Sequence, residues 1–486
     1  MLTVTDLFCG AGGSSSGAIQ VPGVRVRMAA NHWRLAVETH NTNHPDADHD
    51  CADISQTDPR RYPTTDILWA SPECTNHSQA KGARKADRNP DLFDQALPDE
   101  AAERSRATMF DVLRFAEVHR YAAIAVENVV DVRNWVMWPA WALGLKNLGY
   151  DHQVVYLNSM FAQQGGAPAP QSRDRLYVVA WRTGNRRPDL TRWTSPRAWC
   201  PACEREVHAV QAWKRPDKPR GRYRQQYLYR CPTPRCHIAV QPDMLPAAAA
   251  IDWTLPGERI GNRARPLAPK TVARITAGLA RYARTAQLVP AGGTWNDEPR
   301  TVAEPFRTRT TRDTEALVVP PRANRHALVM RNMTARGCPG QMSTPVDEPL
   351  RTQTASSVQS LIRWDHLLVP YYGNGAARPV DQPAGTVTTV DRNALVSADV
   401  TVDDCTFRML EPHEIQAAMA FDSDYRVLGH KRERVRQLGN AVTPPAARDL
   451  IAALVESITG QQVDPPGQPR HADALLTIAN APEGET

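Results

Sequence analysis

The sequence predicts an α/β protein built around a doubly wound parallel sheet. Apolar runs with strand character alternate with stretches of helical spacing through the N-terminal third of the chain, and this alternation favours parallel strands joined by helices. A glycine-rich turn follows the first run, which is typical of sheets that bind a nucleotide-like ligand at the ends of their strands. The strand-like runs are residues 2–8, 24–30, 64–70, 121–128 and 176–181.

Helical patterns lie between these runs and return near the C-terminus. Residues 100–119 place four apolar side chains at helical spacing: Met109, Val112, Leu113 and Ala116. Residues 268–284 have the pattern of an amphipathic helix, and helical patterning returns over 408–458. Residues 461–486 lack such a pattern and predict a flexible tail.

An internal repeat occupies residues 288–396, within a region rich in Pro, Arg and Thr. The sequences E-P-F-R-T-R-T, E-P-L-R-T-Q-T and Q-P-A-G-T-V-T begin at residues 304, 348 and 382, and each precedes an apolar run. We expect successive β-rich units. Chance similarity among loops rich in Pro and Thr is the alternative interpretation.

Composition excludes several classes of protein. The 486 residues carry a net charge of +6, and the basic residues are mainly Arg, which pairs well with phosphates, although GC-rich codon usage also explains the Arg excess. No apolar run approaches the length of a membrane span, and the first residues lack the pattern of a secretory signal. We therefore expect a cytoplasmic protein with no membrane partner, whose nine cysteines stay reduced.

Five short motifs carry candidate chemistry at the ends of the expected strands. In chain order they are D-L-F-C-G-A-G-G from residue 6, S-P-E-C-T-N-H-S from 71, V-E-N-V from 126, Q-S-R-D-R from 171 and Q-L-G-N-A-V from 437. Open parallel sheets bind their ligands at the carboxyl ends of their strands, where Cys74 and Glu127 fall. Singly, each motif has an ordinary structural explanation, such as a buried cysteine or a surface charge.

In this order, the motifs resemble those of the DNA cytosine-5 methyltransferases, over roughly residues 1–183 and 405–458. The resemblance implies a Rossmann-like methyltransferase sheet, with a variable target recognition region between the two matching parts. Cys74 resembles the nucleophile that adds to carbon 6 of cytosine. Glu127 resembles the carboxyl group at N3 of the base, and Arg173 and Arg175 resemble residues that hold the flipped nucleotide.

The resemblance also implies S-adenosylmethionine as cofactor. Phe8, Gly10 and Gly12 resemble its methionine-side contacts, Trp33 and Asp53 its adenine contacts, and Asn440 a residue that shapes the pocket. His32 stands where the family usually has a Glu that binds the ribose, and an imidazole can still hydrogen-bond a hydroxyl. Glu73 and Thr75, on either side of Cys74, also depart from the common pattern.

Two cysteine pairs in the region after residue 186 predict a structural zinc site. Cys200-P-A-Cys203 and Cys231-P-T-P-R-Cys236 lie on tight turns, and four thiolates suit tetrahedral zinc. His208 and His237 are spare candidate ligands, and unrelated reduced cysteines are the alternative. Between the pairs, residues 214–224 form a basic stretch near Tyr223, Tyr227 and Tyr229, which suggests either DNA contact or a solvated insertion.

These observations predict an enzyme that methylates carbon 5 of cytosine in a specific duplex DNA sequence. RNA cytosine-5 methylation and a DNA-binding protein that has lost catalysis are the alternatives. A monomer and a cognate restriction endonuclease are further expectations. We expect a catalytic domain (residues 1–185) that is completed by the C-terminal motifs (405–460) and followed by a tail (461–486). Between its two parts we expect a zinc-binding insert (186–260) and a β-rich recognition region (261–404), which together form one lobe.

Overall fold

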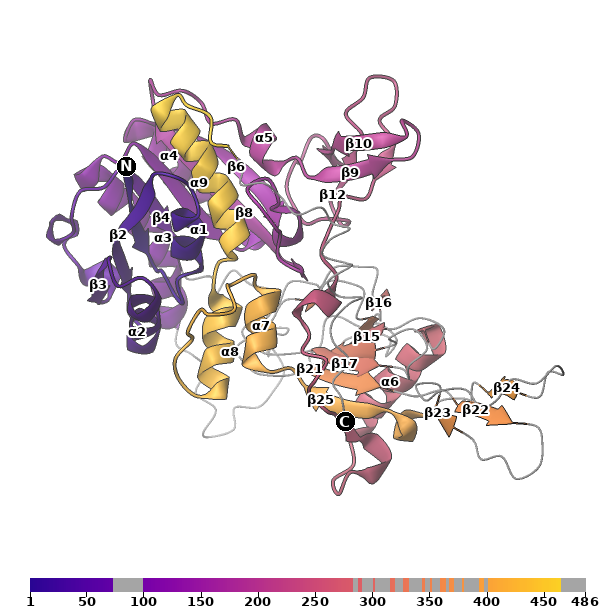
Figure 1. Cartoon of the computed structure of the whole chain (residues 1–486). Helices are drawn as coiled ribbons and strands as arrows, with labels where there is room; N and C mark the ends of the chain where they lie inside the picture. Colours follow the sequence, from indigo (N-terminus) through magenta and orange to yellow (C-terminus); the bar gives the residue numbers. More distant parts are fainter. Residues whose placement is uncertain are drawn as a thin grey trace. The chain divides into compact units, whose positions relative to one another are not determined.

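The computed structural model divides the chain into two compact units (Figure 1). It describes residues 1–72, 99–282 and 401–464, together with short strands between 287 and 396. The first unit comprises residues 1–169, 173–244 and 419–476, and the second comprises 170–172, 245–418 and 477–486. No helix within the described ranges is both long enough and apolar enough to span a bilayer.

A seven-stranded sheet organises the first unit, in the order β3-β2-β1-β4-β5-β8-β6. β8 runs antiparallel to its two neighbours, and the other pairings are parallel. The α/β class is therefore confirmed, although the sheet is mixed and not wholly parallel as predicted, because β8 is antiparallel to β5 and β6. The strands are β1 (Leu2–Leu7), β2 (Val24–Asn31), β3 (Asp48–Cys51), β4 (Ile67–Ala70), β5 (Ala123–Asn128), β6 (Tyr150–Asn158) and β8 (Asp174–Arg182).

Helices bury both faces of this sheet, because the central strands are apolar on both sides. Leu68 and Ala70 of β4 pack in a cluster with residues of α3 (Asp99–His119) and α4 (Trp138–Asn147). Ile67 and Trp69 point the other way, into a cluster with α1 (Gly13–Ile19) and α9 (Pro444–Thr459). Successive strand residues thus serve opposite layers. α2 (Arg34–Asn43) contacts β2 and β3, and α8 (Lys431–Asn440) precedes α9.

The segment with the cysteine pairs belongs to the first unit. It contains α5 (Leu190–Thr194) and two small antiparallel sheets, formed by β9 (Arg197–Cys200) with β10 (Arg205–His208) and by β11 (Val210–Trp213), β12 (Tyr227–Arg230) and β13 (Ala239–Val240). Cys200, Tyr227 and Tyr229 share one buried cluster with the sheet and α3. The expectation that this insert joins the recognition region in one lobe is therefore wrong, because its apolar side chains are buried against the first unit instead.

The repeat has a matching pattern of strand pairing in the second unit. β15 (Gln287–Pro290), β18 (Ala327–Arg331) and β22 (Leu367–Pro370) pair antiparallel with β17 (Glu315–Val319), β21 (Gln359–Arg363) and β24 (Asn393–Val396), respectively. The strands β15, β18 and β22 also pair with a short strand that follows each of them in the sequence. These short strands are, in the same order, β16 (Arg300–Thr301), β19 (Ser343–Pro345) and β23 (Arg378–Pro379). The three sequence repeats therefore coincide with three similar strand arrangements. Most of the repeated Pro-Thr sequence itself falls outside the described residues.

The remaining elements of the second unit lie on either side of the repeat. They are β7 (Gln171–Ser172), which pairs with β20 (Leu350–Arg351), then β14 (Glu258–Arg259), α6 (Pro269–Tyr282), β25 (Thr406–Met409) and α7 (Pro412–Ala418). The side chain of Arg408 forms an ion pair with the buried Glu414. The Glu414 carboxylate also accepts a hydrogen bond from the Asp252 amide, in the segment before β14. Arg408, near the end of β25, and Glu414, in α7, are therefore joined by a buried ion pair within this unit.

Candidate active site

Three expected site segments meet at the carboxyl edge of the sheet. Leu7 of β1 lies opposite Ala70 of β4, which lies opposite Val126 of β5, so Phe8, Ser71 and Glu127 follow at the same level. The Asn128 Nδ2 donates to the Pro72 carbonyl at 3.2 Å, which fixes Pro72, two residues before Cys74 in the sequence. Cys74 itself lies outside the described residues.

Glu127 and Arg175 form an ion pair at this edge. The Arg175 Nε lies 2.9 Å from the Glu127 Oε1, and the two side chains are only 9% and 11% exposed, in that order. The antiparallel pairing of β5 with β8 brings them together, because Glu127 lies opposite Tyr177, two residues along β8 from Arg175. A nearly dry, mutually oriented carboxylate and guanidinium can bind a polar heterocycle without further rearrangement.

Arg173 makes different contacts from Arg175. Its guanidinium is buried and donates to the backbone carbonyls of Gly439, at 3.2 and 3.3 Å, and Ala441, at 2.9 Å. It therefore ties the start of β8 to the turn that follows α8. Its expected part in holding a nucleotide stays a prediction, and these contacts favour an indirect contribution through the shape of the site.

The backbone of the glycine-rich loop lies in the left-handed region at three residues, a conformation that exposes the backbone to a ligand. Phe8, Gly10 and Gly12 all have positive φ angles, of 59°, 53° and 87°. A Cβ at Gly10 would meet no atom within 4 Å, whereas one at Gly12 would lie 2.4 Å from the Tyr425 hydroxyl. One side of the loop is thus open, and the other is packed against the C-terminal part of the unit.

A buried carboxylate holds the helix that follows this loop. The hydroxyl groups of Ser14 and Ser15 both donate to the Asp6 Oδ2 at 2.6 Å. Burial raises the pKa of Asp6 to about 6, against the lowering effect of those two hydrogen bonds. Asp6 therefore connects β1 directly to the first turn of α1.

The expected adenine and ribose contacts lie at the ends of two adjacent strands. Asn31 of β2 lies opposite Cys51 of β3, so His32 and Trp33 follow one strand and Asp53 the other. Trp33 is half-buried, and the Arg436 guanidinium carbon lies 4.6 Å from its ring centroid. His32 and Asp53 are exposed, and the Asp53 Oδ1 accepts from the Ser55 amide at 3.1 Å. Asn440 is exposed at the end of α8.

A histidine cluster beneath the loop was not predicted from the sequence. His40 bonds both the Ser15 hydroxyl, at 2.8 Å, and His49, at 2.7 Å, while His44 bonds the Ser16 hydroxyl at 3.2 Å. Burial and, to a lesser extent, the nearby His49 lower the pKa of His44 to about 4. Isolated histidines on a helical segment give no signal of this network, because it forms only when α2 packs on α1.

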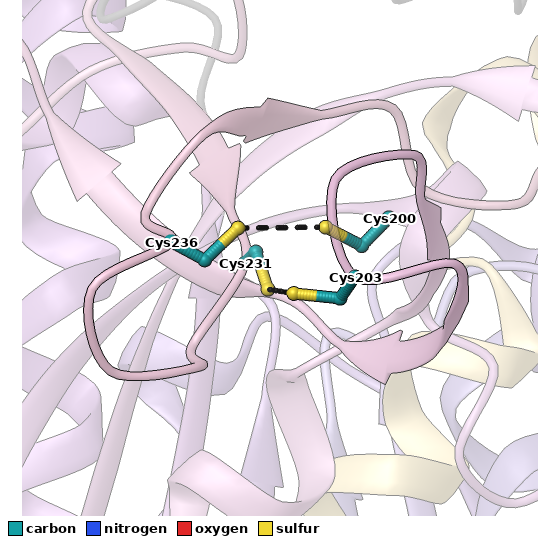
Figure 2. Close-up of side chains that lie close together, drawn as sticks. All are labelled: Cys200, Cys203, Cys231 and Cys236. Atoms are coloured by element: carbon teal, nitrogen blue, oxygen red, sulfur yellow. Dashed lines mark hydrogen bonds between the residues drawn. The ribbon is translucent and has the colours of Figure 1, made fainter.

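The four paired cysteines converge on one point (Figure 2). Cys200 and Cys236 have their sulfur atoms 3.6 Å apart, and those of Cys203 and Cys231 are 3.8 Å apart. Both distances are far longer than a disulfide bond. They match the edge of about 3.8 Å that a tetrahedron of sulfurs has around zinc at about 2.3 Å. Among the described residues, neither His208 nor His237 belongs to the cluster.

Four further residues connect the insert to the edge that carries Glu127 and Arg175. Arg222 pairs with Asp131, which lies in the short helix after β5, and the Tyr223 amide donates to the Asp174 Oδ1 at 3.0 Å. Burial raises the pKa of Asp174 to about 6, although the Tyr223 amide and Arg222 both lower it. Asp174 is the central acid of the Q-S-R-D-R motif, so its position, but not its partner, could be found from sequence.

Comparison with known proteins identifies relatives over the same part of the chain. Residues 2–220 match the family model for C-5 cytosine-specific DNA methylase. The type II methyltransferase M.NlaX of Neisseria lactamica is 30% identical over 184 residues, which is 37% of this chain and 52% of the relative. M.SsoII of Shigella sonnei is 27% identical over 177 residues, which is 36% of this chain and 41% of that protein.

These relatives match only part of their own length. The chain spans about half or less of the length of the curated relatives that it resembles. A solved structure of the S. pombe Dnmt2 methyltransferase matches with a TM-score of 0.45 and 13% identity, covering 94% of this chain and 99% of that one. A score this low adds nothing to the fold described above.

Proposed function

We propose that the chain is a member of the C-5 cytosine-specific DNA methylase family, whose model matches residues 2–220, and that it methylates carbon 5 of cytosine in duplex DNA. The observation that carries the proposal is the largely buried Glu127–Arg175 pair at the carboxyl edge of the sheet, where Asn128 also holds Pro72, two residues before Cys74 in the sequence. A cytosine turned out of the duplex would find hydrogen-bonding groups already oriented there. A cytoplasmic location, a monomeric state and a cognate restriction endonuclease stay predictions.

In the proposed reaction, the Cys74 thiolate adds to carbon 6 of the flipped cytosine. The Glu127 carboxyl group hydrogen-bonds N3 and stabilises the charge that develops on the ring, while Arg175 holds Glu127 in place. This addition makes carbon 5 nucleophilic. S-adenosylmethionine, when bound, supplies the electrophilic methyl group. Loss of the carbon-5 proton then expels the thiolate from carbon 6 and restores the aromatic ring.

The residues of the first unit fit S-adenosylmethionine. The open side of Gly10 leaves room next to the backbone, and the exposed His32 and Asp53 present polar side chains at the ends of β2 and β3. Trp33 would lie against the adenine, with Arg436 fixing the orientation of its ring. His32 would bond a ribose hydroxyl in place of the usual carboxylate, and Asn440 would complete the pocket from α8.

DNA is favoured over RNA as substrate by the description of the matching family model, C-5 cytosine-specific DNA methylase, and by the large second unit. Reading a duplex sequence needs an extended surface for base contacts, and we assign this role to residues 261–404. The preserved Glu127–Arg175 pair also favours an active enzyme over a DNA-binding protein that has lost catalysis.

We assign a structural zinc ion to Cys200, Cys203, Cys231 and Cys236. The separations of their sulfur atoms suit tetrahedral thiolate coordination, and four thiolates leave no open position for catalysis. Zinc would join the turns after β9 and β12 and so stiffen the insert.

A duplex with 5-fluorocytosine at the target position tests the mechanism. Fluorine cannot leave as a proton, so the enzyme should stay covalently attached through Cys74, and peptide mapping should locate the adduct there. Cys74→Ser should abolish both the adduct and methyl transfer to ordinary DNA, while Cys338→Ser, as a matched control, should retain both. An adduct on another residue, or a Cys74→Ser variant that methylates at the normal rate, would rule this mechanism out.

Elemental analysis tests the zinc assignment. Purified protein should contain about one zinc per chain, and Cys231→Ser should lower both the zinc content and the thermal stability of the first unit. Replacing the exposed Cys51, which lies outside the cluster, should leave the zinc content unchanged. Metal-free protein of full stability would contradict the assignment.

A further inference from the structure

The loop between β11 and β12 carries a dense positive charge on an exposed surface. Residues 214–224 contain six Lys or Arg residues and one Asp, and residues 214–220 are all exposed. A charge run alone is usually a solvated turn, so its attachment to the rest of the unit decides what it can do.

Two polar contacts dock the base of this loop on the candidate active site. Arg222 pairs with Asp131, four residues after Glu127, and the side chains of this pair are 21% and 16% exposed. Next along the loop, the Tyr223 amide donates to Asp174, the neighbour of Arg175 in sequence. The loop therefore bonds both chain segments that carry the Glu127–Arg175 pair.

Buried aromatic side chains hold the same docking point. The rings of Tyr223 and Tyr229 meet the Phe161 ring edge-on, with centroids 4.8 and 5.1 Å away, and Tyr227 is completely buried. Gly221 permits the turn, because it has φ +139° and a Cβ there would lie 2.4 Å from the Gln226 side chain. Cys231 directly follows β12, so the proposed zinc ion would stiffen the far end of the same strand. The exposed part of the loop is thus presented from a rigid base.

The charges divide into internal pairs and available cations. Arg222 is paired with Asp131, Arg215 is paired with Asp217, and the Lys214 Nζ donates to the Arg224 carbonyl. Within the part of the chain that the structure describes, no carboxylate forms an ion pair with Lys218 or Arg220. Lys218 and Arg220 are therefore available to bind an external anion, whereas the Arg224 guanidinium donates to the Gln241 Oε1 at 3.3 Å.

We propose that residues 214–220 bind the sugar–phosphate backbone of duplex DNA beside the target cytosine, through Lys218 and Arg220. The inference rests on the proposed function and adds to it a DNA contact made by the insert, independent of the recognition region. Because the docking contacts join the loop to the Glu127–Arg175 segments, a phosphate bound there fixes the distance from the DNA backbone to the site where the base is received. Such contacts position DNA without reading its sequence.

Salt-dependent binding tests the proposal. Lys218→Ala/Arg220→Ala should weaken binding of cognate and unrelated duplexes by the same factor, and the slope of log K against log salt should fall by about 1.8, or about 0.9 per lost phosphate contact. Arg25→Ala/Arg61→Ala is the matched control, because both residues are exposed, Arg25 near the amino end of β2 and Arg61 in the short helix before β4; its slope should be unchanged. An unchanged slope in the loop variant, or an equal loss in the control, would overturn the proposal.

A double-mutant cycle tests the docking. If Arg222 and Asp131 act as one anchor, Asp131→Asn/Arg222→Met should lose no more DNA affinity than Arg222→Met alone, whereas additive losses would contradict the anchor. Thermal unfolding of each variant would identify any that are misfolded, and Arg222→Lys should retain most of the affinity. Wild-type protein that binds DNA but transfers no methyl group would refute the proposed function alone, whereas active wild-type protein with an unchanged loop slope would refute the DNA contact alone.

Discussion

Arg173 and Arg175 show how two like residues acquire different tasks within one motif. Arg175 faces Glu127 at the sheet edge, while Arg173 is buried against the carbonyls of the turn after α8. Their sequence spacing alone indicates a shared face, and it does so for both. What separates them is the partner that tertiary packing supplies, which in one case comes from a residue more than 260 positions away.

Also at the residue scale, the buried His44 should make the free energy of unfolding fall as the pH becomes acidic. Its pKa is about 4 in the folded protein, below the ordinary value of 6.5, because burial disfavours the charged ring. Stability from this group is therefore full above pH 6.5 and is lost as the pH falls toward 4. Between pH 7 and pH 5, the loss from this one group should be about 2 kcal/mol.

Urea unfolding of His44→Gln at both pH values measures this contribution. The variant should lose about 2 kcal/mol less than wild-type protein on acidification, whatever its stability at pH 7. His152→Gln is a control of similar chemistry away from the cluster, and it should lose nearly as much as wild type. Equal pH dependence in wild-type protein and His44→Gln would refute the assignment.

At the scale of elements, α1 and α9 pack so closely that glycine is required between them. A Cβ at Gly17 would lie 2.3 Å from the Pro444 carbonyl oxygen and 2.8 Å from the Ala447 Cβ. Gly17→Ala should therefore destabilise the first unit by about 3 kcal/mol, since the backbone cannot move aside cheaply. Thermal or urea unfolding would measure the loss. Gly460→Ala, where a Cβ meets nothing within 4 Å, should cost much less.

The sequence predicts most of the central elements and misses the edge ones. The apolar strands β1, β2, β4, β5 and β8 and the helix α3 fall where hydrophobic patterns place them, within a few residues. β3 has the sequence D-H-D-C, without an apolar run, and β6 begins Y-D-H-Q, so that only its second half is apolar; both are edge strands of the sheet. The glycine-rich loop and Glu127 are visible as motifs, whereas the histidine cluster and the Arg222–Asp131 pair depend on contacts between distant elements.

At the scale of the whole molecule, the two compact units suggest a division of labour. Replacing groups of Arg residues within 261–404 should relax or abolish the choice of methylated sequence, because base readout needs those side chains. Cofactor affinity, measured by calorimetry, should stay within about threefold of wild type, since its expected contacts lie in the first unit. Sequencing the methylated positions after expression in a methylation-free host would check the pattern. An unchanged pattern across the full set of variants would contradict this division.

The packing of α9 on α1 also has a consequence for biosynthesis. Ribosomes deliver the strands of the first unit early, but the helix that covers one face of those strands emerges only after residue 444. The whole of residues 245–418 is translated in the interval. A nascent chain therefore carries an uncovered apolar sheet face until the second unit has been made, and the loop around Gly12 gains its Tyr425 neighbour no earlier. Completion of the ligand-binding edge is thus delayed, by chain order alone, until the proposed recognition region exists.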